Sequence, residues 1–281
     1  MDTGALYRLN DDFKVLDAIK EGGFKYFDLT LFWKGVTEHI GLGDDCFERA
    51  KEFRKYADSL GLECEQSHAF FCSGRDEETV QKRIEYISKE MKIASIVGAK
   101  SIVIHPVAEF SFDENVSFIN KFISLAHELN LIICVENVWG FANGKYYPIC
   151  TSTASEFVRF LDTINDPFVK ACLDLGHAEI GGDLVSAVEM IENLGSRLFA
   201  LHIHDNDKKN DLHQLPFTYQ IDFVQILDAL KRIDYQGNIT FEVDPCFNNG
   251  YQNIYLPFEL FIPFIRMEND IGQYFVKYLD K

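Results

Sequence analysis

Short β-rich apolar segments alternate with longer segments of helical period along the chain. This pattern predicts repeated strand and helix units that cover a parallel sheet. Eight segments are predicted to be strands: residues 5–9, 24–30, 63–68, 101–105, 131–136, 170–174, 198–202 and 238–242. The first of them has the weakest strand pattern.

Apolar residues recur at helical spacing between the predicted strands, which indicates helix faces that pack on the sheet. Two such faces are formed by Val80, Ile84, Ile87 and Met91 and by Val116, Ile119, Phe122, Ile123 and Ala126. Gly61, Gly98 and Gly237 stand where a helix would end before the next strand begins. The aromatic segment 255–281 is predicted to be a last helix on the barrel, with a dimer contact in a homo-oligomer as the alternative.

Eight strands with eight covering helices predict a single (β/α)8 TIM barrel over residues 1–281, because such a barrel of about 250 residues forms one domain. A doubly wound open sheet alternates in the same way. The sequence has no G-x-G-x-x-G motif after the first predicted strand and no long linker to a second domain, so the barrel is favoured.

The composition fits a folded globule, since 47% of the 281 residues are hydrophobic and 14% are aromatic. A formal net charge of −17 gives an anionic surface, which disfavours nucleic acid as a partner. No apolar run approaches the ~20 residues of a membrane span, and residues 1–4 lack the features of a signal peptide, so we expect a cytoplasmic protein without a membrane partner. The seven cysteines form no C-x-x-C pair and are expected to be reduced.

Six of the eight predicted strands end in a residue that can bind a metal. These residues are His68, His105, Glu136, Asp174, His202 and Glu242. Each alone is typical of a hydrogen-bonded core residue, but the chemistry of barrel enzymes lies at the C-terminal ends of the strands. Three carboxylates at one barrel mouth would repel one another unless a cation lay among them. The set therefore predicts a divalent metal ion.

Further candidates follow the strands closely. His177 comes three residues after a strand-end aspartate, and the i, i+2 spacing of Asp211 and His213 lets two side chains of an extended segment face one ion. His204 is predicted either to contact and orient a metal ligand without binding the ion itself, or to hydrogen-bond with Asp205 at the barrel rim.

Five segments carry a resemblance to a known group: SIVIHPV, ICVENVWG, ACLDLGHAE, LFALHIHDND and ITFEVD. In this order they resemble the xylose isomerase-like TIM barrel superfamily, which contains sugar phosphate isomerases and epimerases, ketose 3-epimerases, inosose-processing enzymes and endonuclease IV. The resemblance spans nearly the whole chain.

In the sugar isomerase and epimerase branch, four strand-end residues hold one divalent ion, and the resemblance assigns this role to Glu136, Asp174, His202 and Glu242. Such an oxygen-rich set suits Mn, Mg or Co and also accommodates Zn. The resemblance implies that Glu136 and Glu242 transfer a proton through a metal-stabilised enediolate, and that His177 contacts a substrate oxygen.

In the endonuclease IV branch there are three zinc ions, and the resemblance offers a match for every ligand. The implied sets are His68, His105 and Glu136 for one ion; Glu136, Asp174, His202 and Glu242 for a second; and His177, Asp211 and His213 for the third. Such a cluster generates hydroxide and stabilises displacement at phosphorus.

The chain departs from both branches. Ketose 3-epimerases usually have an acidic residue where this chain has Ala142, and an arginine where it offers only Lys208 and Lys209. Endonuclease IV usually has a G-E-G turn where residues 215–218 read LPFT.

We therefore expect a metal-dependent isomerase or epimerase that acts on a sugar, sugar phosphate or cyclitol and binds one to three ions, zinc or manganese first. The alternatives are an endonuclease IV-like trinuclear zinc phosphodiesterase acting on abasic-site DNA, and a carbohydrate-binding barrel without turnover. Trp33 and Trp139 are predicted either to stack on a sugar or to pack at the barrel mouth. His39 and His127 are expected to be surface residues.

Overall fold

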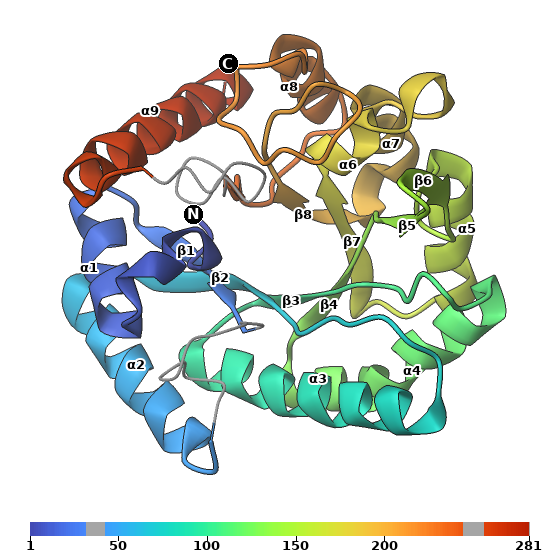
Figure 1. Ribbon diagram of the computed structural model, residues 1–281, viewed down its shortest axis with the longest axis horizontal. Helices are drawn as coiled ribbons and strands as arrows, with labels where there is room; N and C mark the ends of the chain where they lie inside the picture. The colour runs from blue at the N-terminus through green and yellow to red at the C-terminus, as the bar shows by residue number, and fades with distance from the viewer. Residues whose placement is uncertain (32–42, 244–255, 281) are drawn as a thin grey trace.

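Six parallel strands form one curled sheet at the centre of the computed structural model, which describes residues 1–31, 43–243 and 256–280. The sheet order is β1-β2-β3-β4-β7-β8, with every neighbouring pair parallel. The strands are β1 (Tyr26–Thr30), β2 (Glu63–His68), β3 (Ser101–Ile104), β4 (Ile132–Glu136), β7 (Val169–Asp174) and β8 (Leu198–His202). Figure 1 looks down the ring that they form.

Two short segments close the ring between β8 and β1. Asp2 pairs with Asp28 of β1, and its backbone N–H donates to Phe241 O at 3.0 Å. On the other side Ile203 pairs with Phe241. The predicted TIM barrel is confirmed, with residues 1–3 and 240–242 in the places of its first and eighth strands.

The strand predicted over residues 5–9 is wrong, because this segment is the 3-10 helix η1 (Gly4–Leu9). The Asp2 carboxylate accepts a hydrogen bond from Gly4 N at 2.9 Å and turns the chain at this point. A short apolar run does not distinguish a strand from a buried helical turn. The strand predicted over 238–242 is also too long, because its only β-bridge among the described residues is at Phe241.

Helices surround the sheet on its outer side (Figure 1). They are α1 (Asp12–Glu21), α2 (Cys46–Leu60), α3 (Glu77–Val97), α4 (Phe112–Leu129), α5 (Ala154–Ile164), α6 (Leu175–Glu179), α7 (Ala187–Leu194), α8 (Phe223–Arg232) and α9 (Phe261–Leu279), with short 3-10 turns η2 (Gly182–Leu184), η3 (Gly195–Arg197) and η4 (Phe258–Leu260). Gly61 and Gly98 end α2 and α3 in the left-handed conformation, as predicted. Gly237 instead lies in the loop beyond α8, which ends at Arg232.

The last helix packs on the barrel, as its aromatic sequence predicts. Phe261 and Phe275 of α9 are buried, and the ring of Phe275 lies 6.0 Å from that of Phe241. Among the helices that the structure describes, none combines the length and the apolar character that a bilayer span requires.

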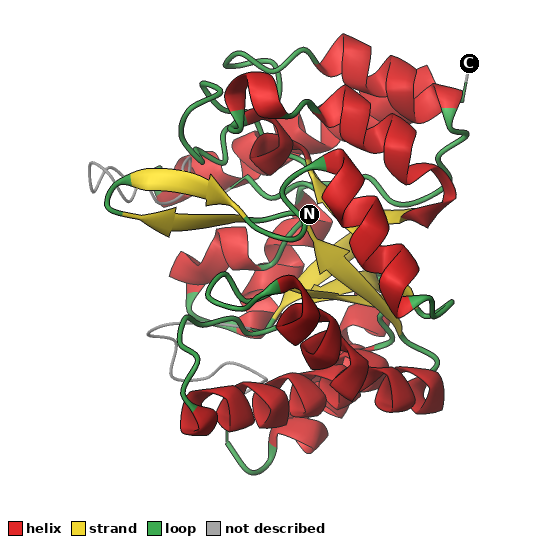
Figure 2. Ribbon diagram, turned by 90° about the vertical axis from the view of Figure 1, so that its right-hand side faces the viewer, coloured by secondary structure: helices red, strands yellow, loops and turns green. Residues whose placement is uncertain are grey.

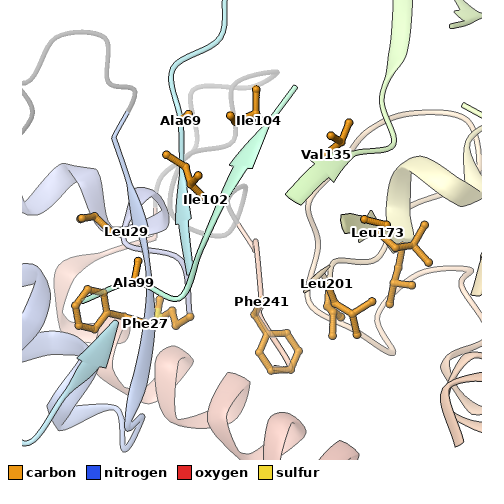
Figure 3. Packing of buried hydrophobic residues seen from close by; sticks show 14 of the residues in the cluster. Phe27, Leu29, Ala69, Ala99, Ile102, Ile104, Val135, Leu173, Leu201 and Phe241 are labelled. Carbon is orange, nitrogen blue, oxygen red and sulfur yellow. The ribbon is translucent and has the colours of Figure 1, made fainter. Parts of the chain in front are cut away.

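Strand alternation decides which side chains face the barrel interior. Residues in the main apolar core include Ile102, Ile104, Val135, Leu173 and Leu201 (Figure 3). The residues between them form a separate small cluster of Val103, Cys134, Cys172 and Ala200. Two positions beyond the last three of these come Glu136, Asp174 and His202, so the same alternation turns three strand-end ligand candidates inward.

A β-hairpin follows β4 and projects from the barrel (Figure 2). Its antiparallel strands are β5 (Trp139–Ala142) and β6 (Lys145–Pro148). Asn143 and Gly144 both have positive φ at the turn between them, which is the usual choice for a two-residue hairpin turn.

Helix α3 holds the loop that follows β2. The buried carboxyl of Glu90 accepts a hydrogen bond from Phe70 N at 2.8 Å. The buried Arg83 guanidinium donates to Cys72 O and, at 3.1 Å, to Gly74 O. Two buried polar side chains of one helix therefore fix the course of this loop.

Replacing Glu90 with Gln should make folding stability less dependent on pH. Burial raises the pKa of the Glu90 carboxyl to about 8. In wild type this carboxyl therefore ionises at a lower pH in the unfolded chain than in the folded protein, and the free energy of unfolding falls as pH rises from about 4.5 to 8. Glutamine retains an acceptor for Phe70 N and does not ionise. Between pH 5 and pH 8, the free energy of unfolding of metal-free Glu90→Gln, measured with urea, should rise by about 3 kcal/mol relative to that of metal-free wild type. Parallel stability curves for the two proteins would contradict this assignment.

Candidate metal centre

All nine residues predicted as metal ligands lie at one end of the barrel. Glu136, Asp174 and His202 are the last residues of β4, β7 and β8, and His68 ends β2. The structure gathers the nine into groups within which the ligand atoms lie within 4.8 Å of one another: His68, His105 and Glu136; Glu136, Asp174, His202 and Glu242; and His177, Asp211 and His213 together with His204. We call these the first, central and third clusters.

The central cluster joins four segments of the barrel. His202 Nδ1 lies 3.2 Å from Glu242 Oε2 and 3.3 Å from Glu136 Oε2. His202 Nδ1 and Asp174 Oδ2 are buried and form no hydrogen bond. Unsatisfied buried polar atoms of this kind are rare in native proteins and cost about 1–3 kcal/mol each. A cation among these atoms would satisfy both, so the residues fit a divalent metal.

The first cluster shares Glu136 with the central one. Glu136 Oε2 lies 2.9 Å from His105 Nε2 and 3.3 Å from His68 Nε2, and the two ring nitrogens are 3.1 Å apart. Ligands of a tetrahedral zinc ion, with Zn–N near 2.0–2.1 Å, would be separated by about 3.3 Å. The spacing of these nitrogens therefore suits two ligands of one ion.

The third cluster lies between α6 and the loop that follows β8. His177 Nε2 is 3.3 Å from Asp211 Oδ2, and His213 Nε2 is 3.2 Å from Asp211 Oδ1. His204 Nε2 is 3.5 Å from the same Oδ1 atom, which is buried and forms no hydrogen bond.

Backbone carbonyls fix the tautomer of three of these histidines. Nδ1 lies 3.0 Å from Ala69 O in His68, 2.9 Å from Asn137 O in His177 and 2.9 Å from Glu242 O in His213. A carbonyl only accepts hydrogen bonds, so each Nδ1 donates and, in the neutral ring, Nε2 carries the lone pair. Metal-binding histidines are typically oriented in this way.

Two supporting side chains, those of Asn137 and Gln66, were missed by the sequence predictions. Asn137 Oδ1 accepts from Asp174 N at 2.6 Å, and its Nδ2 donates to Asp174 O at 2.9 Å. Gln66 Nε2 donates to Asp28 Oδ2 at 2.6 Å and lies 2.8 Å from His202 Nε2. Gln66 stands two residues before His68 on β2, so strand alternation could have identified it as facing the interior.

The electrostatics separates the two glutamates that line the site. Burial would raise the pKa of Glu136, but the neighbouring His105 and His202 outweigh it and hold the pKa well below its ordinary value. For Glu242 burial dominates and raises the pKa, although His202 and His213 oppose the change. Burial acts in the opposite direction on the pKa of His177 and lowers it, but the neighbouring Asp174 and Asp211 outweigh burial and raise that pKa well above its ordinary value.

A pocket of about 450 Å³ opens above the clusters. Seven of the nine candidate ligands line it, namely His68, His105, Glu136, His177, Asp211, His213 and Glu242. Asp174 and His202, the other two, are not among its lining residues, and neither is His204. Aromatic side chains from the hairpin and the β2 loop form part of its wall: Phe71, Trp139, Phe141, Tyr146 and Tyr147. Within the described ranges, no lysine or arginine lines it.

Trp139 lies at the barrel mouth, as one of its two predicted roles requires, whereas stacking on a sugar stays a prediction. Its side chain lines the pocket, and its Nε1–H donates to His177 O at 2.8 Å, which positions the segment that carries His177. Trp33 and His39 lie outside the described residues. His127 is on the surface as predicted, where it pairs with Asp166.

One of the two roles predicted for His204 is wrong. The predicted rim hydrogen bond to Asp205 is wrong, because the Asp205 carboxylate accepts from the backbone N–H groups of Asn206, Thr218 and Tyr219. His204 is instead fully buried, with Nε2 3.1 Å from Asp174 Oδ1.

The fold and the site together define a TIM barrel with clusters of metal-binding residue types at the C-terminal ends of its strands. The family described as "Xylose isomerase-like TIM barrel" matches residues 16–251. The chain belongs to this family.

Curated relatives differ in how much of the chain they match. An L-ribulose 3-epimerase of Methylomonas sp. (strain DH-1) is 25% identical over 252 residues, which cover 84% of this chain and 82% of the relative. A probable endonuclease 4 of Mycoplasma mobile is 28% identical over 136 residues, which cover 46% and 47%. The chain spans about half the length of relatives from Methanocaldococcus jannaschii and Sinorhizobium fredii, at 56% and 53%.

Solved structures of sugar epimerases share the fold. A D-psicose 3-epimerase superposes with a TM-score of 0.74 at 16% identity, covering 94% of this chain and 93% of that one. The 3-keto-D-glucoside 4-epimerase of E. coli gives a TM-score of 0.69 at 16% identity and covers 94% of each chain.

Proposed function

We propose that this protein is a metal-dependent isomerase or epimerase that moves a proton at a carbon of a sugar, sugar phosphate or cyclitol. The central cluster carries the proposal. Its four residues come from four separate segments of the barrel, and their ligand atoms converge within 4.8 Å beneath a pocket of sugar size. The similarity to an L-ribulose 3-epimerase over most of both chains supports the same class of reaction.

The donor set favours a hard divalent cation. Three carboxylates and one imidazole suit Mn, Mg or Co, and Zn is also accommodated. Such a cation, when bound, polarises a substrate carbonyl and makes the neighbouring C–H more acidic.

Glu136 and Glu242 are placed to handle the proton. Both line the pocket, and they lie on either side of His202 Nδ1 at 3.3 and 3.2 Å. Glu136 is only 1% exposed and is held by the histidines of both clusters, whereas the Glu242 side chain is 17% exposed. We assign Glu242 to proton abstraction and Glu136 to its return. His177 Nε2 faces Asp211, so we assign it to the third cluster rather than to a substrate oxygen.

The pocket favours an uncharged polyhydroxylated substrate. Aromatic rings such as Phe71 and Tyr146 offer faces for the C–H groups of a sugar, while the carboxylates of Glu136 and Glu242 can accept hydrogen bonds from hydroxyls. With no lysine or arginine among its described lining residues, a phosphate group would have to be bound by cations or histidines.

Solvent exchange tests the proposal. Protein loaded in turn with Mn²⁺, Co²⁺ and Zn²⁺ is incubated in D₂O with free ketoses, ketose phosphates and inososes, and the sugars are followed by NMR. We expect deuterium at the carbon next to the carbonyl of at least one free ketose. Binding of sugars without exchange at full metal occupancy would contradict the proposal and favour a carbohydrate-binding barrel.

A second candidate rests on a specific observation, namely that three clusters share one pocket and that the first and central clusters share Glu136. This arrangement suits a trinuclear zinc phosphodiesterase acting on abasic-site DNA. Cleavage of an abasic-site duplex by the zinc protein, lost in His213→Ala, would favour it. The charge of −17 weighs against binding to DNA.

A further inference from the structure

Both ring nitrogens of His204 are buried without a hydrogen bond. The side chain is fully buried, and neither Nδ1 nor Nε2 forms a hydrogen bond of acceptable geometry. A buried polar group left without a hydrogen-bond partner costs about 1–3 kcal/mol. Nε2 lies 3.1 Å from Asp174 Oδ1 and 3.5 Å from Asp211 Oδ1, so this nitrogen is directed into the metal clusters rather than away from them.

Gly176 leaves the space that the His204 ring fills. A Cβ atom at position 176 would lie 1.9 Å from His204 Cε1 and 2.4 Å from Nε2, which no real contact allows. The close approach of the His204 ring requires glycine at position 176. The backbone conformation does not, because the φ angle of Gly176 is not in the left-handed region. The ring also stacks against that of His213, with centroids 4.0 Å apart. The fold therefore builds a specific cradle for this imidazole.

The third cluster also contains a strained ligand candidate. His213 has a φ angle of 47°, in the left-handed region that residues other than glycine rarely adopt. Such strain costs about 1–3 kcal/mol and persists where the surroundings impose it. Here it accompanies the approach of His213 Nε2 to Asp211 Oδ1 at 3.2 Å.

We propose that His204 is a fourth protein ligand of the third cluster, which makes this a closed cation site with a structural role. The four donors are His177, His204, Asp211 and His213, whose ligand atoms lie within 4.8 Å of one another. Four protein ligands, three of them imidazoles, complete the tetrahedral coordination that structural zinc sites use. The central cluster also offers four, but three of them are carboxylates, and the hard cations that such ligands suit take about six ligands, which leaves positions for substrate oxygens. The cation would tie α6, the end of β8 and the loop 207–213 together.

This assignment goes beyond the proposed reaction and does not depend on it. A closed third site takes no water or substrate oxygen, so the chemistry is left to the central cluster. It also disfavours the phosphodiesterase alternative, because a three-ion hydrolase needs its ions accessible to the scissile phosphate.

Cobalt substitution tests the closed site through the electronic spectrum. Four-coordinate Co²⁺ absorbs much more strongly in the visible range than five- or six-coordinate Co²⁺. Metal-free wild-type protein titrated with Co²⁺ should develop an intense band as the third cluster fills. In His204→Gln the band should lose its intensity, and the affinity for that ion should fall at least about 100-fold, since even an outer-shell change costs 10–100-fold.

Two further variants control the experiment. Gly176→Ala keeps all four ligand side chains but displaces the His204 ring, so it should lose the same band. His105→Gln removes a ligand candidate of the first cluster and should keep it. Circular dichroism establishes that each variant is folded.

A His204→Gln protein with an unchanged band and affinity, or wild-type protein that saturates at one Co²⁺ per chain, would overturn the proposal. Deuterium exchange is a separate measurement, so failure of the closed site is distinguishable from failure of the isomerase assignment.

Discussion

Replacing Glu242 with Gln should reduce deuterium exchange at the substrate carbon by about 10³-fold, within the range typical of a lost general base. The change preserves the shape of the side chain and an acceptor oxygen near His202 Nδ1, from which Glu242 Oε2 is now 3.2 Å away. It removes the carboxylate that would accept the proton. Exchange is measured by NMR in D₂O on the substrate found in the sugar screen, with metal content determined for each protein.

Glu109→Gln is the matched control, because Glu109 lines the same pocket but belongs to none of the three clusters. Its exchange rate should stay within a few-fold of the wild-type rate. If Glu242→Gln retained wild-type exchange at full metal occupancy, Glu242 could not be the base. A loss explained entirely by loss of metal would assign Glu242 to binding alone.

Removing divalent cations should lower the midpoint of thermal unfolding by about 10 °C. Metal binding at a thousand times the dissociation constant stabilises the folded state by about 4 kcal/mol, and each kcal/mol shifts the midpoint by about 2–4 °C in a protein of this size class. The physical reason is that Glu136, Asp174 and Glu242 lie together in one cluster with little exposure to water, where their charges repel one another without a cation. Differential scanning calorimetry before and after chelation and dialysis measures the effect.

Asp174→Asn provides the control for this stability effect. The amide oxygen can still accept from His177 N, as Asp174 Oδ1 does at 2.6 Å, but one of the buried charges is gone. Chelation should therefore lower the midpoint of thermal unfolding less in the variant than in wild type. Equal midpoints for wild-type protein with and without metal would contradict the metal assignment.

Most of the site could be predicted from the sequence because strand alternation determines it. Cys134 faces the barrel interior, so Glu136 two positions later must do the same, and the relation holds again for Cys172 and Asp174. The last positions of parallel strands meet at one end of a barrel whatever the loops do. The nine predicted ligand candidates are therefore close in space, although their role as ligands stays a prediction.

The errors came where local pattern does not determine the structure. The segment 5–9 contains too few residues to distinguish a strand from the helical turn η1 that the hydrogen bond from Gly4 N to Asp2 initiates. The hairpin after β4 has a readable signal in Asn143-Gly144, which the sequence predictions did not use. The position of His204 had no such signal, because it depends on the space left by Gly176, which is distant in sequence.

The number of metal ions per chain tests the central claim most directly. Protein purified without chelator, saturated with Zn²⁺ or Mn²⁺ and dialysed, is analysed by elemental mass spectrometry against protein concentration. We predict two to three ions per chain, with at least one lost in a protein carrying Asp174→Asn and Glu242→Gln together. A ratio well below one ion per chain after saturation, or a ratio unchanged in the double variant, would contradict a central cluster that binds a divalent cation.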